Sequence, residues 1–432
     1  PHNLFVGKPG WDRYDGRLLQ GTALLEHRFD ESARINLKAR YIDSDLTYLT
    51  HYPNNYTNPA NPYLDADQRI IGLYVDGSIA RMEIFSTDNN VQLDFNTGSA
   101  IAHTLLTGID YSFNSVHKTG GFAVEMIDIY DIDYDALSDY GGGLPTPTYV
   151  AEDVDQDQLG IYVQDQIRFF DRLSIVLGAR RDWTSAQSMG GATRHDAATT
   201  FRAGIIGEIV EGVSPFFSYT ESFEPIAGTA SDGSAFIPKS GRQFEAGIKF
   251  HPTDAILMTV TGYRIKESNR PVSDDSTADP FDQIQIGSLT SKGIEFEGNA
   301  ALPGELNIIA NASYNEAEIE GTGQQLDNVP KFNASLWATK GLLLGDDTRL
   351  LLGGGVRHVG RNRSFGPAFP DGILTPSFTL IDALVEVSYA HWSFALNATN
   401  LFDKRYYSAC LARGDCFQGS ERNVMATVSY RF

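Results

Sequence analysis

The chain has 432 residues, of which 42% are hydrophobic, and a formal net charge of -21 at pH 7. This apolar content excludes a disordered chain, and the acidic charge excludes a nucleic-acid partner, because phosphate binding needs a basic surface. The 41 Gly, 20 Tyr and 25 Phe against only 5 Met favour strands and turns over helices, so we expect an all-β protein.

Composition leaves two kinds of all-β protein open. No run of about 18 apolar residues occurs, so no transmembrane helix is predicted, and the mean hydropathy is slightly negative. That average does not separate a soluble sandwich from a membrane barrel, because alternating strands dilute their own hydropathy.

The predicted elements begin with a loop at residues 1–15, and strands then follow in pairs joined by tight turns. The predicted pairs are 16–29 with 33–44, 68–93 with 102–114, 159–169 with 173–183, 201–210 with 213–220, 242–250 with 255–265, 291–301 with 306–315, 332–343 with 348–359 and 379–389 with 393–401, followed by a last strand at 424–432. Long loops separate the pairs, including 45–67, a stretch that reaches position 156, 184–199 and 403–421.

Tight turns therefore alternate with loops of about 12 to 40 residues, which is typical of an outer-membrane barrel with short periplasmic turns and long external loops. The faces of the strands agree with this prediction. Residues 244–250 and 294–300 carry apolar side chains on one face and Glu or Lys on the other. A basic residue facing lipid at mid-bilayer costs about 2 to 4 kcal/mol, so we expect Lys249 and Glu295 to face the lumen.

The pattern contains 17 strands, whereas bacterial single-chain barrels have even numbers. An open edge in lipid would leave backbone groups without hydrogen bonds. The chain begins within a predicted loop, residues 1–15, and these residues show no signal-peptide pattern. We therefore expect further strands to precede Pro1.

Cys410 and Cys416 lie six positions apart in the last long loop. No His is near them in sequence, which argues against a zinc site. A short-range disulfide, which would imply an oxidising compartment, is favoured over a pair of free thiols, and both readings stay open. Closing so small a loop stabilises by only about 2 kcal/mol, so a bond would mainly shape the loop.

Eight stretches, in order along nearly the whole chain, resemble the TonB-dependent outer-membrane receptors and, within them, the ferrichrome-type hydroxamate siderophore receptors. They are HTLLTGIDYS (103–112), GIYVQDQIRFFDRLSIVLGARRDW (160–183), PFFSYTESFEP (215–225), GRQFEAGIKF (241–250), SKGIEFEGNAAL (291–302), VPKFNASLWA (329–338), NLFDKRYYSAC (400–410) and CFQGSERNVMATVSYRF (416–432). The NLFDKRYY motif is common to the wider family, and the Cys pair before F-x-G-x-E-R is more specific to the ferrichrome-like branch.

The resemblance implies a transmembrane antiparallel β-barrel of about 22 strands in the outer membrane of a Gram-negative cell. Residues 1–432 would form strands 6 to 22 of this partial barrel domain. The first strands and the N-terminal plug domain, which fills the lumen and holds the energy-coupling box, would be absent.

The family binds iron-siderophores through aromatic side chains in external loops and at the plug apex, so the resemblance makes eight aromatic residues candidates for substrate contacts. They are Trp11, Tyr48, Tyr52, Tyr56, Phe122, Tyr130, Tyr407 and Phe417. The first six are expected in outward-facing loops. The alternative is that these residues form the interfacial girdle or pack loops. Leu411 stands where the family's last loop often has an aromatic residue, and Tyr407 or Phe417 would replace that contact.

An acidic stretch raises the question of a metal. Asp131, Asp133 and Asp135 resemble the start of a calcium loop, but Ala136 stands in place of the turn glycine and Gly142 in place of the bidentate Glu, which excludes an EF-hand. Residues 119–167 contain eleven acidic residues and no Lys or Arg. A loosely bound divalent cation that bridges lipopolysaccharide is one reading, and a solvated loop is the favoured one.

The sequence has no G-x-S-x-G, H-E-x-x-H or Gly-rich phosphate loop, so no enzyme is expected. The resemblance implies energy-coupled uptake of ferric siderophores, with ferrichrome-like hydroxamates expected, and no cofactor, because iron arrives bound to the siderophore. The implied partners are the siderophore, the inner-membrane TonB complex acting through the plug, outer-membrane lipid and lipopolysaccharide. The alternatives are a passive pore, a surface-binding barrel such as an adhesin or phage receptor, and a receptor for another metal chelate or cobalamin.

Overall fold

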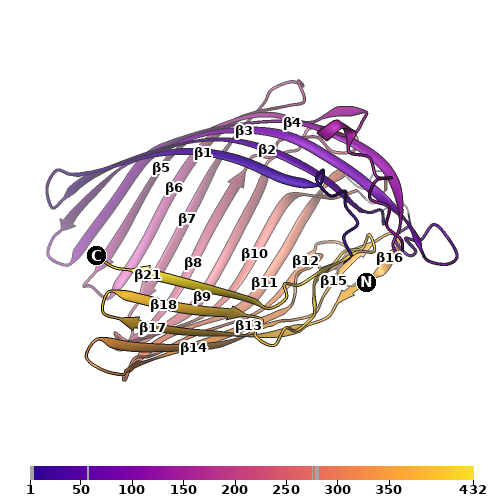
Figure 1. The fold of residues 1–432 in the computed structure, drawn as a ribbon. Helices are drawn as coiled ribbons and strands as arrows, with labels where there is room; N and C mark the ends of the chain where they lie inside the picture. Colours follow the sequence, from indigo (N-terminus) through magenta and orange to yellow (C-terminus); the bar gives the residue numbers. More distant parts are fainter. Residues whose placement is uncertain (1–3, 56–57, 275, 278–281) are drawn as a thin grey trace.

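The computed structural model describes residues 4–55, 58–274, 276–277 and 282–432. It contains one antiparallel sheet of 17 strands, in which neighbours in space are neighbours in the strand order of the chain (Figure 1). The all-β prediction and the number of strands are confirmed. None of the helices in these residues is long and apolar enough to cross a membrane.

The strands of the main sheet are β1 (Arg13–Arg28), β2 (Ala33–Pro53), β3 (Ile70–Thr97), β4 (Ile101–Asp128), β5 (Thr148–Phe169), β6 (Leu173–Ser188), β7 (Arg194–Gly207), β8 (Val213–Glu224), β9 (Lys239–Thr253), β10 (Ile256–Ser273), β11 (Gln283–Leu302), β12 (Leu306–Ile319), β13 (Phe332–Leu343), β14 (Thr348–Val359), β17 (Phe378–Tyr389), β18 (Trp392–Thr399) and β21 (Asn423–Tyr430). The smaller elements are the hairpins β15 (Asn362–Gly366) with β16 (Phe369–Thr375) and β19 (Tyr407–Cys410) with β20 (Cys416–Gln418), and the short helix η1 (Tyr140–Gly142).

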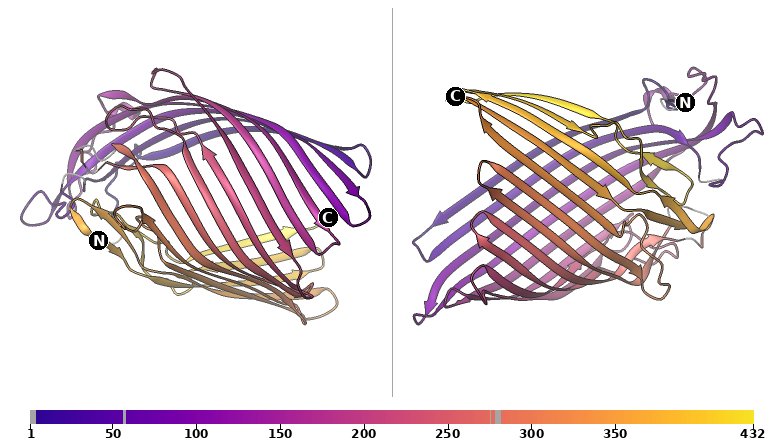
Figure 2. Two further views of the ribbon diagram at one scale, coloured as in Figure 1. Left: turned by 180° about the vertical axis from the view of Figure 1, so that it is seen from behind. Right: turned by 90° about the horizontal axis from the view of Figure 1, so that it is seen from below.

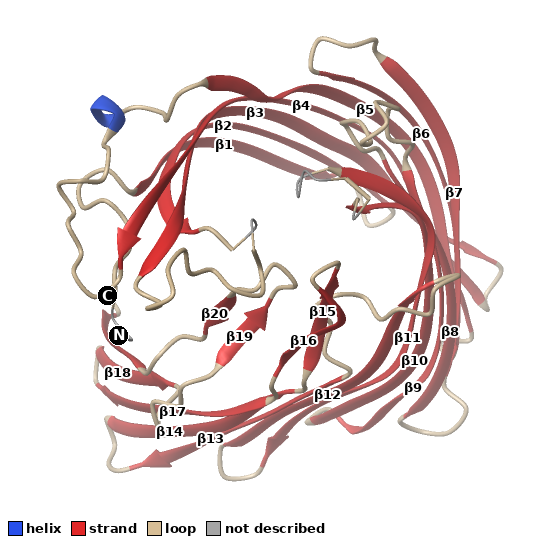
Figure 3. Cartoon of the chain, turned by 90° about the vertical axis from the view of Figure 1, so that its right-hand side faces the viewer, coloured by secondary structure: helices blue, strands red, loops and turns tan. Residues whose placement is uncertain are grey.

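The sheet curves around an open interior, with β1 and β21 as its two edges (Figures 2 and 3). Among the described residues, β1 pairs only with β2, and β21 pairs only with β18. Every residue of β21 is exposed, and so is every residue of β1 after Arg13. The ring is therefore open between these two strands.

The two ends of the ring differ. Short turns close one end, and long connections together with the hairpins β15–β16 and β19–β20 lie at the other, where the hairpins fold inside the outline of the ring (Figure 3). We call the second end the mouth.

Several connections are shorter than predicted. β2 and β4 continue to Pro53 and Asp128, and β5 begins at Thr148, so two long loops shrink to 54–69 and 129–147. Outside a bilayer both faces of a strand can be polar while the backbone ladder continues. Hydropathy alternation therefore ends before the strand does.

The same effect makes one predicted loop wrong. Residues 184–199 were expected to form a long loop, but β6 and β7 are joined by residues 189–193 alone. Ser185 and His195, inside the expected loop, are direct partners in the sheet.

The register sorts side chains into two faces. One row across neighbouring strands is polar, with Lys38 opposite Asp88, Asp88 opposite Asp110, and Gly160 opposite Asp182. Lys38, Asp88 and Asp110 are among the residues that line a cavity of about 710 Å³. The next row is mainly apolar and consists of Val91, Thr107, Val163, Ala179 and Phe201. Lipid would meet the apolar row, as predicted from the alternation.

An ionic network ties the polar row together. The Arg180 guanidinium donates to both carboxylate oxygens of Asp110, at 2.5 and 2.8 Å, and to Asp182 at 2.7 Å. The Tyr162 hydroxyl donates to Asp88 at 2.6 Å, and Lys38 lies 3.7 Å from the same carboxylate. Two cations, Lys38 and Arg180, therefore pair with three carboxylates across strands β2 to β6.

The expectation that charged residues face the lumen has several exceptions, among them Asp165, Arg181 and Lys292. Asp165 is the direct partner of Leu105, on the apolar side, and its carboxylate lies 2.7 Å from the Nδ1 atom of His103. Both residues are close to the short turns that follow Phe169 and precede Ile101. A charge near the end of a strand meets the interface rather than mid-bilayer, where the cost is lower.

Candidate functional site

The candidate site is built on the mouth ends of β2, β3 and β4. The pairing of β2 with β3 is regular from Ala33–Leu93 to Pro53–Leu73, and that of β3 with β4 is regular over all 28 residues. Side chains alternate between faces, so even-numbered residues of these strands share the face of Lys38 and Asp88 and look into the mouth.

That face carries aromatic rings, which we call the aromatic wall. Its members are Tyr14, Tyr48, Tyr52, Tyr74 and Phe122. The ring centroids of Tyr52 and Tyr74 are 5.6 Å apart and those of Tyr74 and Phe122 are 4.2 Å apart, whereas Tyr14 and Tyr48 meet edge to face at 5.8 Å.

The wall keeps apolar surface open to the mouth. Tyr14 is 71% exposed, and Val124 and Met126, which share the face, are 58% and 66% exposed. Tyr48, Tyr52, Tyr74 and Phe122 are partly buried against one another. An exposed apolar surface of this kind is a candidate for ligand binding.

The prediction that Tyr48, Tyr52 and Phe122 lie in loops is wrong, because they lie in β2 and β4. Their strands continue above the membrane, and the alternation that places them in the mouth also brings in Tyr14 and Tyr74. Tyr74 was missed because it lies inside a segment predicted as a strand, and Tyr14, in the predicted loop at residues 1–15, was not selected. Tyr56 lies outside the described residues.

Trp11 has a different position, on the outer side of the wall. Its ring is 1% exposed, lies 4.8 Å from the His51 ring and 5.6 Å from the Tyr140 ring, and its Nε1 atom donates to the carbonyl of Gly143 at 3.1 Å. The buried side chains of Leu49 and Val75 complete the cluster. Trp11 therefore packs the 129–147 connection onto the wall and presents no open ring face to a ligand.

Polar contacts surround this cluster. The imidazole of His51 bonds to Asp12 through Nδ1 at 2.7 Å, and its Nε2 lies 3.7 Å from Glu125. The Tyr140 hydroxyl donates to Glu125 at 2.8 Å, and burial, followed by this hydrogen bond, raises the pKa of Tyr140 to about 12. The cluster holds the N-terminal segment and the 129–147 connection against β2 and β4.

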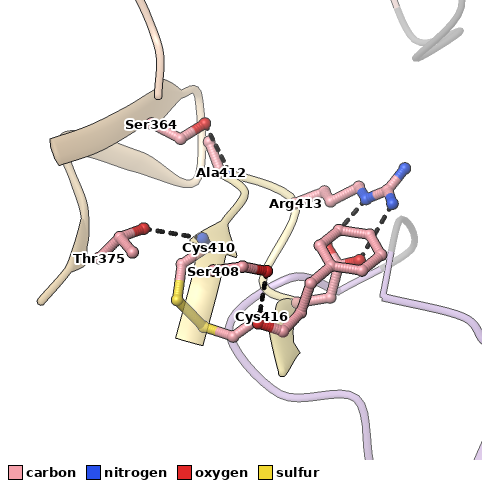
Figure 4. Close-up of a disulfide and its surroundings, with 9 residues drawn as sticks. Ser364, Thr375, Ser408, Cys410, Ala412, Arg413 and Cys416 are labelled. Atoms are coloured by element: carbon pink, nitrogen blue, oxygen red, sulfur yellow. Dashed lines mark hydrogen bonds and ion pairs between the residues drawn. A yellow bond between two sulfur atoms is a disulfide. The ribbon is translucent and has the colours of Figure 1, made fainter. Parts of the chain in front are cut away.

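The disulfide hairpin forms a second part of the site. Cys410 and Cys416 are bonded, and the pair is fixed by backbone donors of the hairpin: Cys410 to the Thr375 hydroxyl at 2.8 Å and Ala412 to the Ser364 hydroxyl at 3.0 Å (Figure 4). The bond thus anchors the last loop to the β15–β16 hairpin.

Two predicted contact residues lie in this hairpin. Tyr407 and Phe417 are each 48% exposed. The Arg413 guanidinium lies 5.9 Å from the centre of the Phe417 ring and bonds to Asp415 at 2.8 Å. Gly414 lies against Pro59 of the 54–69 connection, which continues from β2. The hairpin therefore contacts the connection that follows β2.

Tyr130 lies just beyond β4 and is 64% exposed. The Arg69 guanidinium lies 5.4 Å from its ring centre and bonds to Asp128 at 2.7 Å. The role of Tyr130 as a ligand contact stays a prediction.

The acidic stretch does not form a metal centre in the residues that the structure describes, which hold no group of three or more His, Cys, Asp or Glu side chains placed to bind an ion. Asp133 instead accepts hydrogen bonds from the backbone of Asp135 and Ala136. Part of the stretch is strand, because Glu152 and Asp157 lie in β5. The divalent-cation reading gains no support.

Comparison with known proteins identifies the family. Residues 2–401 match the family model described as TonB dependent receptor-like, beta-barrel. The chain is 32% identical over 442 residues to the ferrichrome outer membrane transporter/phage receptor of Escherichia coli, a match that covers 94% of this chain and 57% of that protein. It is 30% identical over 453 residues to the ferrioxamine B receptor of Salmonella typhimurium, covering 100% of this chain and 61% of that protein.

Solved structures share the fold. The ferric preacinetobactin receptor BauA from Acinetobacter baumannii matches with a TM-score of 0.80 at 18% identity, over 99% of this chain and 64% of that chain. The pyoverdine receptor FpvA from Pseudomonas aeruginosa matches with a TM-score of 0.80 at 20% identity, over 97% of this chain and 62% of that chain.

The chain spans about three fifths of the length of the curated relatives described above. Its strands, its two-faced register and the position of the mouth are those of an outer-membrane barrel of a Gram-negative cell. The chain belongs to the TonB-dependent receptor family and matches its β-barrel domain.

Proposed function

We propose that the protein binds a ferric siderophore of the hydroxamate class at the mouth and passes it inward by energy-coupled transport. The observation that carries this proposal is the aromatic wall, which faces the mouth beside the disulfide hairpin. An iron chelate wrapped in an organic ligand offers an apolar surface, and aromatic rings bury such a surface at low cost in conformational entropy. The names of two relatives, a ferrichrome transporter and a ferrioxamine B receptor, support hydroxamates as the substrate class.

Fluorescence quenching of the intact receptor, produced from its complete gene, tests the substrate. We expect quenching by ferric hydroxamates and none by a ferric catecholate or cobalamin. Quenching by cobalamin or a catecholate alone would overturn the substrate class. Saturable binding without uptake in energised cells would favour a surface-binding barrel instead.

Substitutions test the site. Tyr74→Ala or Phe122→Ala should weaken binding by about 2 kcal/mol, or roughly thirtyfold in Kd, as expected for a central aromatic contact. Tyr389→Ala, at the end of β17, is the matched control because this exposed tyrosine lies at the turn end of the barrel. Equal effects of all three variants would contradict the assignment.

The remaining partners follow from the proposed transport. The family name implies coupling to TonB, and a receptor role makes catalysis unnecessary, so we propose no enzymatic activity and no cofactor. Uptake that persists when the TonB protein is deleted would refute the coupling and would favour a passive pore.

We also propose that lipopolysaccharide covers part of the outer face. Arg264 and Lys292 are direct partners on the face of Ile294, and Lys266 and Lys292 are about half exposed. Basic side chains just above an apolar band attract anionic headgroups. Replacing Lys266 and Lys292 with Gln should lower the lipopolysaccharide that copurifies with the receptor, and an unchanged amount would refute this contact.

A further inference from the structure

We infer that the aromatic wall contains a site for a cationic group of the substrate, built around the carboxylate of Asp76. The substrate would then be a ferric hydroxamate chelate that carries a protonated amine. This inference rests on the proposed function, which it makes more specific.

Asp76 lies within the aromatic wall. It is the direct partner of Thr50 in β2 and Phe122 in β4, and it is two positions from Tyr74 on the same face of β3. The next residue, Gly77, points to the opposite side, where a Cβ would lie 2.8 Å from the side chains of Leu49 and Pro145. The carboxylate of Asp76 therefore faces the mouth.

Asp76 differs from other acidic residues around the wall in having no ion pair among the described residues. Asp128 is bonded to Arg69 at 2.7 Å, and Asp12 is bonded to His51 at 2.7 Å. Burial raises the pKa of Asp76, whereas the charge of Lys118 and the amide of Gly77 lower it. A partly buried carboxylate without an ion pair is stabilised by a bound cation.

The neighbouring rings suit the same ligand. The Tyr74 and Phe122 rings, 4.2 Å apart, lie beside Asp76 in the register, and the faces of aromatic rings attract cations. A carboxylate also forms a charge-assisted hydrogen bond with an ammonium group. A neutral chelate would gain only the contact with the rings, and an anionic chelate would be repelled by the carboxylate.

The test compares two chelates that differ by one charge. The probes are a linear ferric trihydroxamate that ends in a primary amine and its N-acetylated form, titrated against the intact receptor from the complete gene. We expect the amine form to bind about tenfold more tightly, which is the scale of one charge-assisted contact at a half-open site. Asp76→Asn should remove this difference by weakening only the amine form, and Asp76→Glu should retain part of it.

Asp135→Asn is the matched control, because it makes the same charge change in the exposed 129–147 connection. Equal affinity of the two chelates for the wild type, or equal losses for both in Asp76→Asn, would overturn the cationic site while the proposed function stands. If neither chelate binds the wild type, the proposed function fails as well. Should Asp76→Asn fail to assemble, the preference of the wild type for the amine form and its reduction in about 1 M NaCl decide the question.

Discussion

Gly414 of the disulfide hairpin lies directly against the carbonyl oxygen of Pro59, in the connection that follows β2. A Cβ atom at position 414 would lie 2.2 Å from that oxygen, and Gly414 has a φ of 95°. The contact needs a residue without a side chain on both counts. It joins the C-terminal hairpin to the connection that follows β2, although the two are far apart in the sequence.

Gly414→Ala should therefore separate the two parts of the site. The positive φ alone costs about 1 to 2 kcal/mol for alanine, and the backbone oxygen of Pro59 has to move. We expect weaker binding of a ferric hydroxamate and faster proteolysis of residues 403–422. Gly233→Ala is the control, because Gly233 has a φ of 80° but nothing within 4 Å of its would-be Cβ. Identical behaviour of the two variants would show that the Pro59 contact has no role.

Trp11→Ala should release the 129–147 connection from the outer side of the wall. Removing a buried tryptophan costs about 3 to 5 kcal/mol, and the carbonyl of Gly143 loses its donor. The measurement is amide hydrogen exchange in residues 129–147, which should become faster, while exchange in β9 to β12 should not change. Tyr130→Ala, at an exposed ring, is the control; unchanged exchange in the Trp11 variant would contradict the packing role.

Arg180→Gln should weaken the barrel wall, because it leaves the carboxylates of Asp110 and Asp182 without their shared cation. Breaking a fully buried ion pair costs about 3 to 5 kcal/mol, and partial solvent exposure of Arg180 reduces our expectation to about 2 kcal/mol. The measurement is the temperature at which the compact band is lost on gels, and this temperature should be lower for Arg180→Gln than for the wild type. Arg181→Gln is the control, since this guanidinium bonds to Thr199 on the other face; equal losses would refute the network.

Glu320 should make the connection after β12 sensitive to acid. Hydrogen bonds from Lys266, Ser288 and Thr290 lower the pKa of Glu320 to about 2. Because the pKa is depressed in the folded state, the stabilisation is complete above pH 4.5 and is lost as the pH falls toward 2. Pepsin cleavage within residues 320–331 should rise over that range in the wild type. In Glu320→Gln, cleavage of this segment should be high over the whole pH range. If cleavage changed with pH in the same way in both proteins, the prediction would be contradicted.

Residues 1–432 expressed alone should not form a closed barrel. β1 and β21 each have one paired side in the described residues, and an unpaired edge in lipid leaves backbone groups without partners. We expect a protease-sensitive product in detergent with no shift in gel mobility on heating. A heat-modifiable, protease-resistant band would show that the two edges close on each other.

Much of the barrel was predictable because its signal is local. The period of two places Ile294 and Phe296 on one face of β11 and Glu295 on the other face. The same pattern recurs in most strands of the sheet. The number of strands and their order followed from this pattern and from turn residues. Strand ends at Pro53, Asp128 and Thr148 were not predictable from it, because hydropathy ceases to alternate where the lipid ends while backbone pairing continues.

The candidate site was only partly predictable for the same reason. Tyr48, Tyr52 and Phe122 were selected as loop aromatics, yet the register puts them on one strand face together with Tyr74 and Asp76. Trp11 could not be separated from them by residue type, because burial by the 129–147 connection depends on contacts with residues distant in the chain.

The order of amino acids was thus sufficient for the class of fold, the number of strands and the two ends of the barrel, since each depends on residues a few positions apart. Which aromatic rings look into the mouth, which are buried behind the wall, and how the Cys410–Cys416 hairpin reaches Pro59 depend on long-range register and on packing between distant segments. Those contacts exist only once the sheet has curved and its loops have folded over it.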